Sequence, residues 1–251
     1  MLPITKAGMS QTVLVTGSSG TVGSAVVAEL QRRGHTLRGF DKVPAIEPRD
    51  MTCAALLDRR ALNIAMTGVD CLVHLAATPE DDDFFTQLVP NNIAALYCVM
   101  ESARGAGVRR IVLASSSQVN WWRQMRGPFP IREDEPVTPR GWYAASKMFA
   151  EAIGCAFAEA HGISVIAARL GWCPRPNQER EFGEAEWAPD VYLSPGYAGR
   201  FFACCVEAPE SVRHLTVNAT SKPVGTARFD LTVAKEVLGY EPQDTWIAKI
   251  W

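Results

Sequence analysis

The sequence predicts an α/β protein with a doubly wound parallel sheet and helices on both faces, and three observations support this. A short apolar strand near the N-terminus leads into a glycine-rich turn and then a helix. Strand-like and helix-like segments keep alternating after it, as a parallel sheet with crossover helices requires. The chain has 251 residues, of which 47% are apolar, so it can bury one substantial core.

The elements follow from apolar periodicity and from the glycines and prolines between them. A proline-rich loop at 124–141 follows the fifth strand, and no internal repeat or linker interrupts the pattern. The predicted strands are 12–16, 36–40, 51–57, 71–75, 110–114 and 164–170, and the main helices are 24–30, 59–67, 91–106 and 147–160.

Composition excludes several classes of function. A net charge of −2 leaves no basic surface for nucleic acid. No apolar run reaches the ~18 residues of a membrane span. The seven cysteines include no C-x-x-C pair and the four histidines are scattered, so we expect no metal site. Free cysteines in apolar patterns fit a reducing, cytoplasmic compartment.

The turn Gly17-Ser18-Ser19-Gly20-Thr21-Val22-Gly23 has the features of a phosphate-binding corner. Glycines permit a tight turn and close approach of the backbone to a pyrophosphate, and the helix end supplies free N–H groups. The spacing is G-x-x-G-x-x-G rather than G-x-G-x-x-G. We therefore expect a Rossmann-type dinucleotide site with contacts from Gly17, Ser19, Gly20, Thr21, Val22 and Gly23.

Asp41 stands at the end of the second predicted strand and favours NAD over NADP. A carboxylate there can accept hydrogen bonds from both ribose hydroxyls and repels a 2′-phosphate. Lys42 follows it and softens the repulsion, so the preference is not absolute. A solvated loop aspartate is the alternative.

Tyr143 and Lys147 lie four residues apart in W-Y-A-A-S-K, which places both on one face of a helix. An ammonium near a phenol favours the phenolate, so the pKa of Tyr143 is expected to fall. Such a tyrosine can take a proton from a substrate hydroxyl. The pattern alone also fits an ordinary surface pair.

Six motifs in order make the chain resemble the extended, epimerase-like branch of the short-chain dehydrogenase/reductase superfamily. They are G-S-S-G-T-V-G (17–23), H-L-A-A (74–77), N-N-I-A-A-L (91–96), I-V-L-A-S-S-S-Q-V (111–119), E-D-E-P-V-T-P (133–139) and Y-A-A-S-K (143–147). The resemblance implies a catalytic triad of Ser116, Tyr143 and Lys147, with Tyr143 as general base. It also implies further cofactor contacts from Leu56, Leu75, Ala76, Ala77 and Asn92, besides Tyr143 and Lys147.

Within that branch, the segment A-A-R-L-G-W-C-P-R-P-N-Q-E-R (167–180) and the short C-terminal part resemble uronate dehydrogenases. Those enzymes oxidise the C1 hydroxyl of a hexuronic acid to an aldarolactone with NAD. Ser117 and Gln118 stand where that family has asparagine and histidine, and Pro79 replaces a serine. The implied substrate contacts are Thr78, Ser117, Gln118, Trp172 and Arg180. Arg180 would meet the substrate carboxylate, with Arg175 as second choice.

The sequence thus predicts an NAD-dependent oxidoreductase acting on a sugar hydroxyl, the C1 hydroxyl of a hexuronic acid being one candidate. An epimerase, dehydratase or carbonyl reductase of the same fold is the alternative, and a non-catalytic NAD-binding protein a third. We expect a flexible leader over 1–10, an NAD-binding domain with the triad over 11–171, and a small substrate-binding portion over 172–251. By resemblance we also expect a homodimer through helices 92–104 and 143–160, with a sugar or sugar acid as small-molecule partner.

Overall fold

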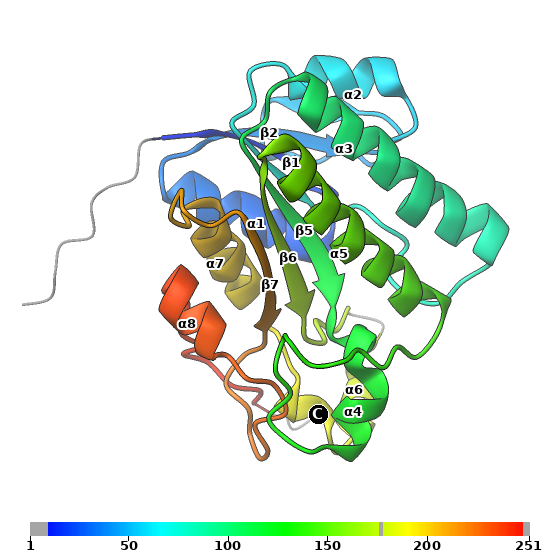
Figure 1. Ribbon diagram of the computed structural model, residues 1–251, viewed down its shortest axis with the longest axis vertical. Helices are drawn as coiled ribbons and strands as arrows, with labels where there is room; N and C mark the ends of the chain where they lie inside the picture. Colours follow the sequence, from blue (N-terminus) through cyan, green and yellow to red (C-terminus); the bar gives the residue numbers. More distant parts are fainter. Residues whose placement is uncertain (1–9, 176–177, 248–251) are drawn as a thin grey trace, which may run out of the picture.

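The computed structural model describes residues 10–175 and 178–247 of the chain. Its centre is a seven-stranded parallel sheet in the order β3-β2-β1-β4-β5-β6-β7 (Figure 1). The strand order reverses between β1 and β4, which confirms the doubly wound α/β fold. The strands are β1 (Thr12–Thr16), β2 (Thr36–Asp41), β3 (Met51–Cys53), β4 (Cys71–His74), β5 (Arg110–Ser116), β6 (Ser164–Leu170) and β7 (His214–Ala219).

Helices cover both faces of the sheet (Figure 1). Along β1, Val13 and Val15 join a core cluster with α1 and α7, whereas Leu14 between them joins a second cluster with α2, α3 and α5. Successive side chains on a strand point to opposite faces, so one short strand seeds both cores. The longer helices are α1 (Thr21–Arg32), α2 (Arg59–Met66), η1 (Phe84–Ala94), α3 (Ala95–Gly105), α5 (Trp142–His161), α7 (Pro195–Val206) and α8 (Thr232–Leu238).

Shorter helical pieces surround the carboxyl edge of the sheet. They come from two parts of the sequence, directly after β5 and after β6, and Figure 1 shows α4 and α6 below the strand ends. The pieces are η2 (Ser117–Asn120), α4 (Trp121–Arg126), α6 (Glu179–Glu184) and η4 (Ala188–Asp190).

The helix predicted to begin at Asn91 in fact begins seven residues earlier, at Phe84. The Asp83 side chain caps it by accepting the Thr86 N–H at 2.8 Å, and the Leu88 N–H reaches the Asp83 carbonyl at 3.1 Å, five residues back. Pro90 lies inside this π-helical stretch rather than before the helix. Proline lacks an N–H and crowds the preceding turn, and the wider π turn accommodates both effects.

Other elements also differ from the sequence prediction. The helix with the tyrosine begins at Trp142 rather than at 147, so Tyr143 lies in its first turn. The third strand covers only residues 51–53, because it is an edge strand that pairs with β2 alone. A seventh strand, β7, was not predicted; it pairs with β6 and extends the sheet.

The chain after residue 171 contributes to the main core as well as to the pocket. Helix α7 supplies fully buried Phe201 and Phe202 to the cluster it shares with α1, and Val217 of β7 joins them. The division at 171 stays a prediction. Residues 1–9 of the expected leader lie outside the described residues. Within the described part of the chain, no helix has the length and apolar character to cross a bilayer.

Candidate active site

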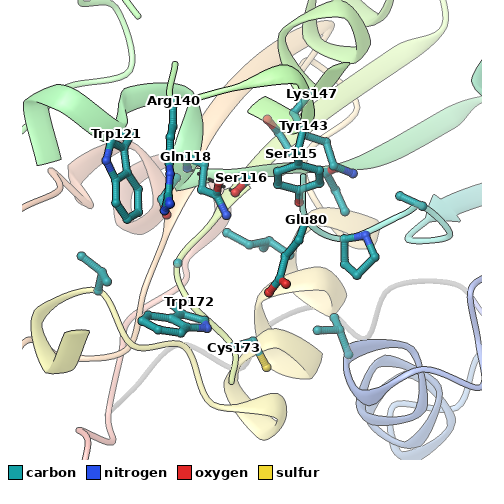
Figure 2. A pocket seen from close by; sticks show the side chains of 18 of the residues that line it. Glu80, Ser115, Ser116, Gln118, Trp121, Arg140, Tyr143, Lys147, Trp172 and Cys173 are labelled. Carbon is teal, nitrogen blue, oxygen red and sulfur yellow. Dashed lines mark hydrogen bonds between the residues drawn. The ribbon is translucent and has the colours of Figure 1, made fainter. Parts of the chain in front are cut away.

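A pocket of ≈ 420 Å³ opens at the carboxyl edge of the sheet. It is lined by Val22 at the start of α1, by the segments that follow β4, β5 and β6, and by the first turns of α5. Carboxyl ends of parallel strands meet at one edge, so segments far apart in sequence converge there. Figure 2 shows Ser116, Tyr143 and Lys147 together on one side, with Trp172 and Cys173 across from them.

The glycine turn is packed too closely for side chains at two of its positions. Gly17 has φ +72°, and a Cβ there would lie 2.7 Å from the Ala76 nitrogen. A Cβ on Gly23 would lie 2.0 Å from the Gly17 carbonyl oxygen. Gly20 begins α1 without any side-chain cap, and no acidic residue lies in the first turn. This end of α1 keeps free N–H groups and a positive dipole end, which suits a pyrophosphate.

Asp41 is held beside the turn by backbone hydrogen bonds. Its Oδ2 accepts the Ser19 N–H at 3.1 Å, and its Oδ1 accepts the Val43 N–H at 3.1 Å. The Ser19 hydroxyl donates to the Val43 carbonyl at 2.6 Å. Each carboxylate oxygen can accept a further hydrogen bond, so the group is oriented and still able to bind two ribose hydroxyls.

Ser116, Tyr143 and Lys147 are all buried and come together as the motif predicts. The side chains of Tyr143 and Ser116 share a hydrogen bond, and Ser116 Oγ also accepts the Gln118 N–H at 3.2 Å. Lys147 Nζ lies 5.6 Å from the centre of the tyrosine ring and donates to the Ala114 carbonyl at 2.9 Å. One serine hydroxyl, one phenol and one ammonium therefore converge at the end of β5.

Burial is the largest cause of the pKa shifts of Tyr143 and Lys147. It raises the pKa of Tyr143 to about 12, and the hydrogen bond from Ser116 opposes that rise. It lowers the pKa of Lys147 to about 8. The lowered tyrosine pKa expected from the sequence is thus not observed. The reason is that desolvation disfavours the phenolate more than its neighbours favour it.

The neighbouring Ser115 has a different task. Its hydroxyl donates to Glu151 Oε1 at 2.5 Å, and Arg169 holds the same carboxylate through two bonds of 3.0 and 2.8 Å. Alternation along β5 sends the two serine side chains in opposite directions. Ser116, rather than Ser115, is left to meet the phenol.

Asn92 of η1 and Asp81 of the loop after β4 fix the first turn of α5. Asn92 accepts the Thr78 N–H at 2.8 Å and donates to Ser146 Oγ at 3.0 Å, and that hydroxyl donates to the Tyr143 carbonyl at 2.7 Å. The Asp81 carboxylate accepts the Tyr143 N–H at 2.7 Å. The helix start itself, Gly141, offers no side-chain cap, so Asp81 supplies it from 62 residues away.

The predicted cofactor contacts fall into two groups. Gly17, Ser19, Gly20, Thr21, Gly23 and Asp41 form the turn and its flank, while Val22, Leu75, Ala77, Tyr143 and Lys147 line the pocket. Ala76 lies against Gly17, with its N–H 3.5 Å from Thr16 Oγ1. Leu56 packs against the α2 side of the core instead of lining the pocket, and Asn92 acts through the hydrogen bonds just described.

The predicted substrate contacts agree less well with the structure. Ser117, Gln118 and Trp172 line the pocket. Thr78 does not, because its hydroxyl is held by Asn91 at 3.0 Å. Arg180 does not either: its side chain is 91% exposed and pairs with Glu184 at 2.9 Å, one turn along α6. Arg180 therefore lies outside the lining of this pocket, whereas the second choice, Arg175, belongs to the lining.

Sequence reasoning missed several groups on the substrate side. Glu80, Asp81, Gln124, Arg140 and Trp187 all line the pocket. Gln124 is almost fully buried, and its Oε1 has no hydrogen-bond partner among the described residues. The run of four acidic residues at 80–83 was the visible signal for the first two. No sequence pattern indicated Gln124, Arg140 or Trp187, because they reach the pocket only when distant loops come together in the fold.

Aromatic rings form the wall opposite Tyr143. Trp172 stacks on Trp187 with ring centres 5.5 Å apart, and Trp121 meets Trp187 edge to face at 5.3 Å. The Arg140 guanidinium lies 4.5 Å above the Trp121 ring. Broad apolar faces with a few polar groups suit a sugar ring. Within the described residues, no cluster of His, Cys, Asp and Glu could hold a metal ion.

Comparison with known proteins gives a consistent result. Residues 13–181 match the model of the NAD dependent epimerase/dehydratase family. The chain is 30% identical to an L-arabinose 1-dehydrogenase (NAD(P)(+)) of Haloferax volcanii, over 92% of this chain and 96% of that protein. It is also 30% identical to a uronate dehydrogenase of Pseudomonas putida, over 67% of this chain and 63% of that protein.

Solved structures of sugar-acid dehydrogenases share the fold over nearly the whole chain. Uronate dehydrogenase from Agrobacterium tumefaciens aligns with a TM-score of 0.75 at 27% identity, covering 94% of this chain and 85% of that one. A glucuronic acid dehydrogenase from Chromohalobacter salexigens aligns with a TM-score of 0.79 at 26% identity and the same two coverages.

Proposed function

This chain belongs to the NAD-dependent epimerase/dehydratase family, the extended branch of the short-chain dehydrogenase/reductases, and we propose that it oxidises a sugar hydroxyl with NAD. The observation that carries the proposal is the convergence of Ser116, Tyr143 and Lys147 on a pocket walled by aromatic rings. The glycine turn adjoins that pocket through Val22. A dinucleotide site and a proton-transfer site thus share one cavity.

The residues present fit NAD. The close-packed glycines and the uncapped N-terminus of α1 would hold its pyrophosphate, and Asp41 would accept the hydrogen bonds of the adenosine ribose. Lys147 would donate to the second ribose in place of its bond to the Ala114 carbonyl. When bound, NAD supplies the acceptor for the hydride that leaves the substrate carbon.

Tyr143 and Ser116 have separate roles at the substrate hydroxyl. For oxidation, the Tyr143 phenol first releases its own proton to solvent; the phenolate oxygen then takes the proton of the substrate hydroxyl, while Ser116 Oγ donates a hydrogen bond to the same substrate oxygen. Burial holds the pKa of Tyr143 at about 12, so the phenol is protonated at neutral pH. It is therefore a ready proton donor for the reverse reaction, and oxidation speeds up as pH rises.

Two classes of sugar remain as substrates for this proposal. The hexuronate interpretation draws support from the segment after β6 and from the structural similarity to uronate dehydrogenases. It draws no support from Arg180, whose exposed side chain pairs with Glu184 and is not part of the pocket lining. The neutral-aldose interpretation draws support from the L-arabinose 1-dehydrogenase, which matches over 96% of its own length. In both, the hydroxyl at C1 is the group oxidised.

We also propose a homodimer through α3 and α5. Tyr97 and Phe149 are exposed on these helices, at 57% and 36%, and offer apolar contact area. The surface is smaller than the sequence indicated, because Leu96 and Val99 are buried in the protomer's own core. Light scattering at micromolar concentration should give twice the protomer mass. A single-protomer mass would contradict the dimer.

The direct test is net formation of NADH with a panel of aldoses, hexuronic acids and simple secondary alcohols. We expect NADH with at least one cyclic sugar and little with the secondary alcohols. Sugar that changes configuration without net NADH would instead indicate an epimerase. No reaction with any sugar would contradict the proposal.

A further inference from the structure

Glu80 and Arg175 form an ion pair within the pocket lining that joins two loops. Glu80 belongs to the loop after β4, and its Oε1 lies 2.8 Å from Arg175 Nη2 in the segment after β6. Gln178 donates its side-chain N–H to the same oxygen and accepts the Arg175 N–H at 3.2 Å. Figure 2 shows Glu80 between Tyr143 and the segment that carries Trp172 and Cys173.

We infer that Glu80 sets the charge selectivity of the pocket, so that the chain oxidises neutral aldoses in preference to hexuronates. The inference rests on the proposed sugar dehydrogenase function and names its substrate class. Arg175 is the cation on the β6 side of the pocket, and Glu80 already neutralises it. A substrate carboxylate would have to displace Glu80 and then face its negative charge, and like charges at close range repel.

The other charged groups in the pocket lining do not reverse the preference for a neutral substrate. Asp81 and Glu181 add negative charge, and Asp81 is already bonded to the Tyr143 N–H. Lys147 also lines the pocket, but it is buried and donates to the Ala114 carbonyl. Arg140 is the one competing cation in the described lining. Its guanidinium is stacked on the Trp121 ring, and an Arg140→Gln variant tests whether it recognises an acid.

The uncharged part of the lining suits hydroxyl groups. The unpartnered Gln124 Oε1 is a buried acceptor that a sugar O–H can satisfy. Gln118 adds an amide, and Trp172 an aromatic face. A neutral sugar ring therefore finds hydrogen-bond partners in this pocket. A substrate carboxylate, by contrast, meets an Arg175 that is already paired with Glu80.

The experiment compares kcat/KM for D-galactose and D-galacturonate, which differ only at C6, with NAD saturating. We expect the unmodified chain to favour the neutral sugar by about tenfold or more. Glu80→Gln keeps an acceptor for Gln178 but removes the charge, so the uronate-to-aldose ratio should rise about tenfold. Arg175→Gln leaves Glu80 unpaired, so the same ratio should fall. The two variants therefore move the ratio in opposite directions.

Three outcomes would overturn the inference. One is an unmodified chain that favours the uronate; another is a ratio that neither Glu80→Gln nor Arg175→Gln moves by more than about twofold. The third is a large loss of uronate activity in Arg140→Gln, which would place acid recognition at Arg140. If Glu80→Gln fails to fold, Arg175→Gln alone decides. Failure of every sugar to yield NADH would refute the proposed function itself, so the two failures are distinct.

Discussion

The two halves of the pocket are built in different ways. The cofactor half, formed by the glycine turn (17–23) and Asp41, uses backbone groups and close packing around β1 and β2. The substrate half, formed by residues 79–81, 117–124, 171–175 and 178–187, uses side chains from loops that meet only in the fold. Sequence motifs located the first half well and the second half poorly. Conformation fixed by neighbouring residues is readable in sequence, whereas contacts between distant loops are not.

The largest expected effect lies where the halves meet. Tyr143→Phe removes the phenol oxygen and leaves the ring in place, so turnover should fall at least about a hundredfold. NAD affinity, measured by titration, should change little. Tyr97→Phe removes an exposed phenol on α3 and serves as the matched control. A Tyr143→Phe enzyme with near-normal turnover would remove Tyr143 from the reaction.

Burial of the Lys147 ammonium should lower the stability of the folded protein, and a substitution at Lys147 measures by how much. Its pKa is lowered to about 8 by burial, so the unfolded chain holds this proton more tightly than the folded one. The resulting penalty is complete below about pH 8 and disappears as pH rises through the ordinary lysine pKa of about 10.4. Lys147→Met should therefore raise stability at neutral pH by about 2 kcal/mol, after losing the bond to the Ala114 carbonyl.

Thermal or denaturant unfolding measures this gain at several pH values. The gain should shrink as pH rises from about 8 to about 10. Lys235→Met, at an exposed lysine paired with Glu241, should show no such gain. A Lys147→Met protein less stable than the parent at neutral pH would contradict the buried-charge account.

Asp41 tests the cofactor half. Asp41→Ala should reduce the preference for NAD over NADP by about tenfold, because the variant no longer repels a 2′-phosphate or binds the ribose hydroxyls. Binding titrations with both cofactors measure it. Asp50→Ala, at a largely exposed carboxylate paired with Arg38, is the control. Equal binding of NAD and NADP by the unmodified chain would contradict this role.

Asp81 connects the halves, because it caps the helix that carries Tyr143. Asp81→Ala should lower kcat several-fold with little change in the KM for NAD, and should cost about 1 kcal/mol of stability. Asp81→Asn keeps a capping oxygen and should restore most of the loss. Asp82→Ala, at the next residue, should be silent. No rescue by asparagine would argue against capping as the cause.

Arg180 should show the smallest effect, which sharpens the contrast between sequence and structure. Its side chain is exposed and pairs only with Glu184 among the described residues. Arg180→Ala should change kcat/KM for any sugar by less than about twofold. A large rise in the KM for a hexuronate would restore the assignment drawn from the sequence.

Particular residues show why the sequence predicted so much of the fold and only part of the site. The strand-turn-helix at 12–32 is local, so its pattern determines it. Tyr143 and Lys147 are likewise one helical turn apart. By contrast, Glu80 meets Gln178 across 98 residues, and Pro90 lies within a π-helical stretch that apolar periodicity does not reveal. The direction of the Tyr143 pKa shift also escaped prediction, because burial is its largest cause and depends on the whole fold.

The central claim is that a sugar C1 hydroxyl is oxidised where the two halves meet. The most direct measurement uses an aldose with deuterium at C1 and follows the mass of the reduced cofactor. The account predicts that the deuterium appears in the reduced nicotinamide and that Tyr143→Phe suppresses the transfer. Reduced cofactor without deuterium, or sugar consumed with no reduced cofactor at all, would contradict it.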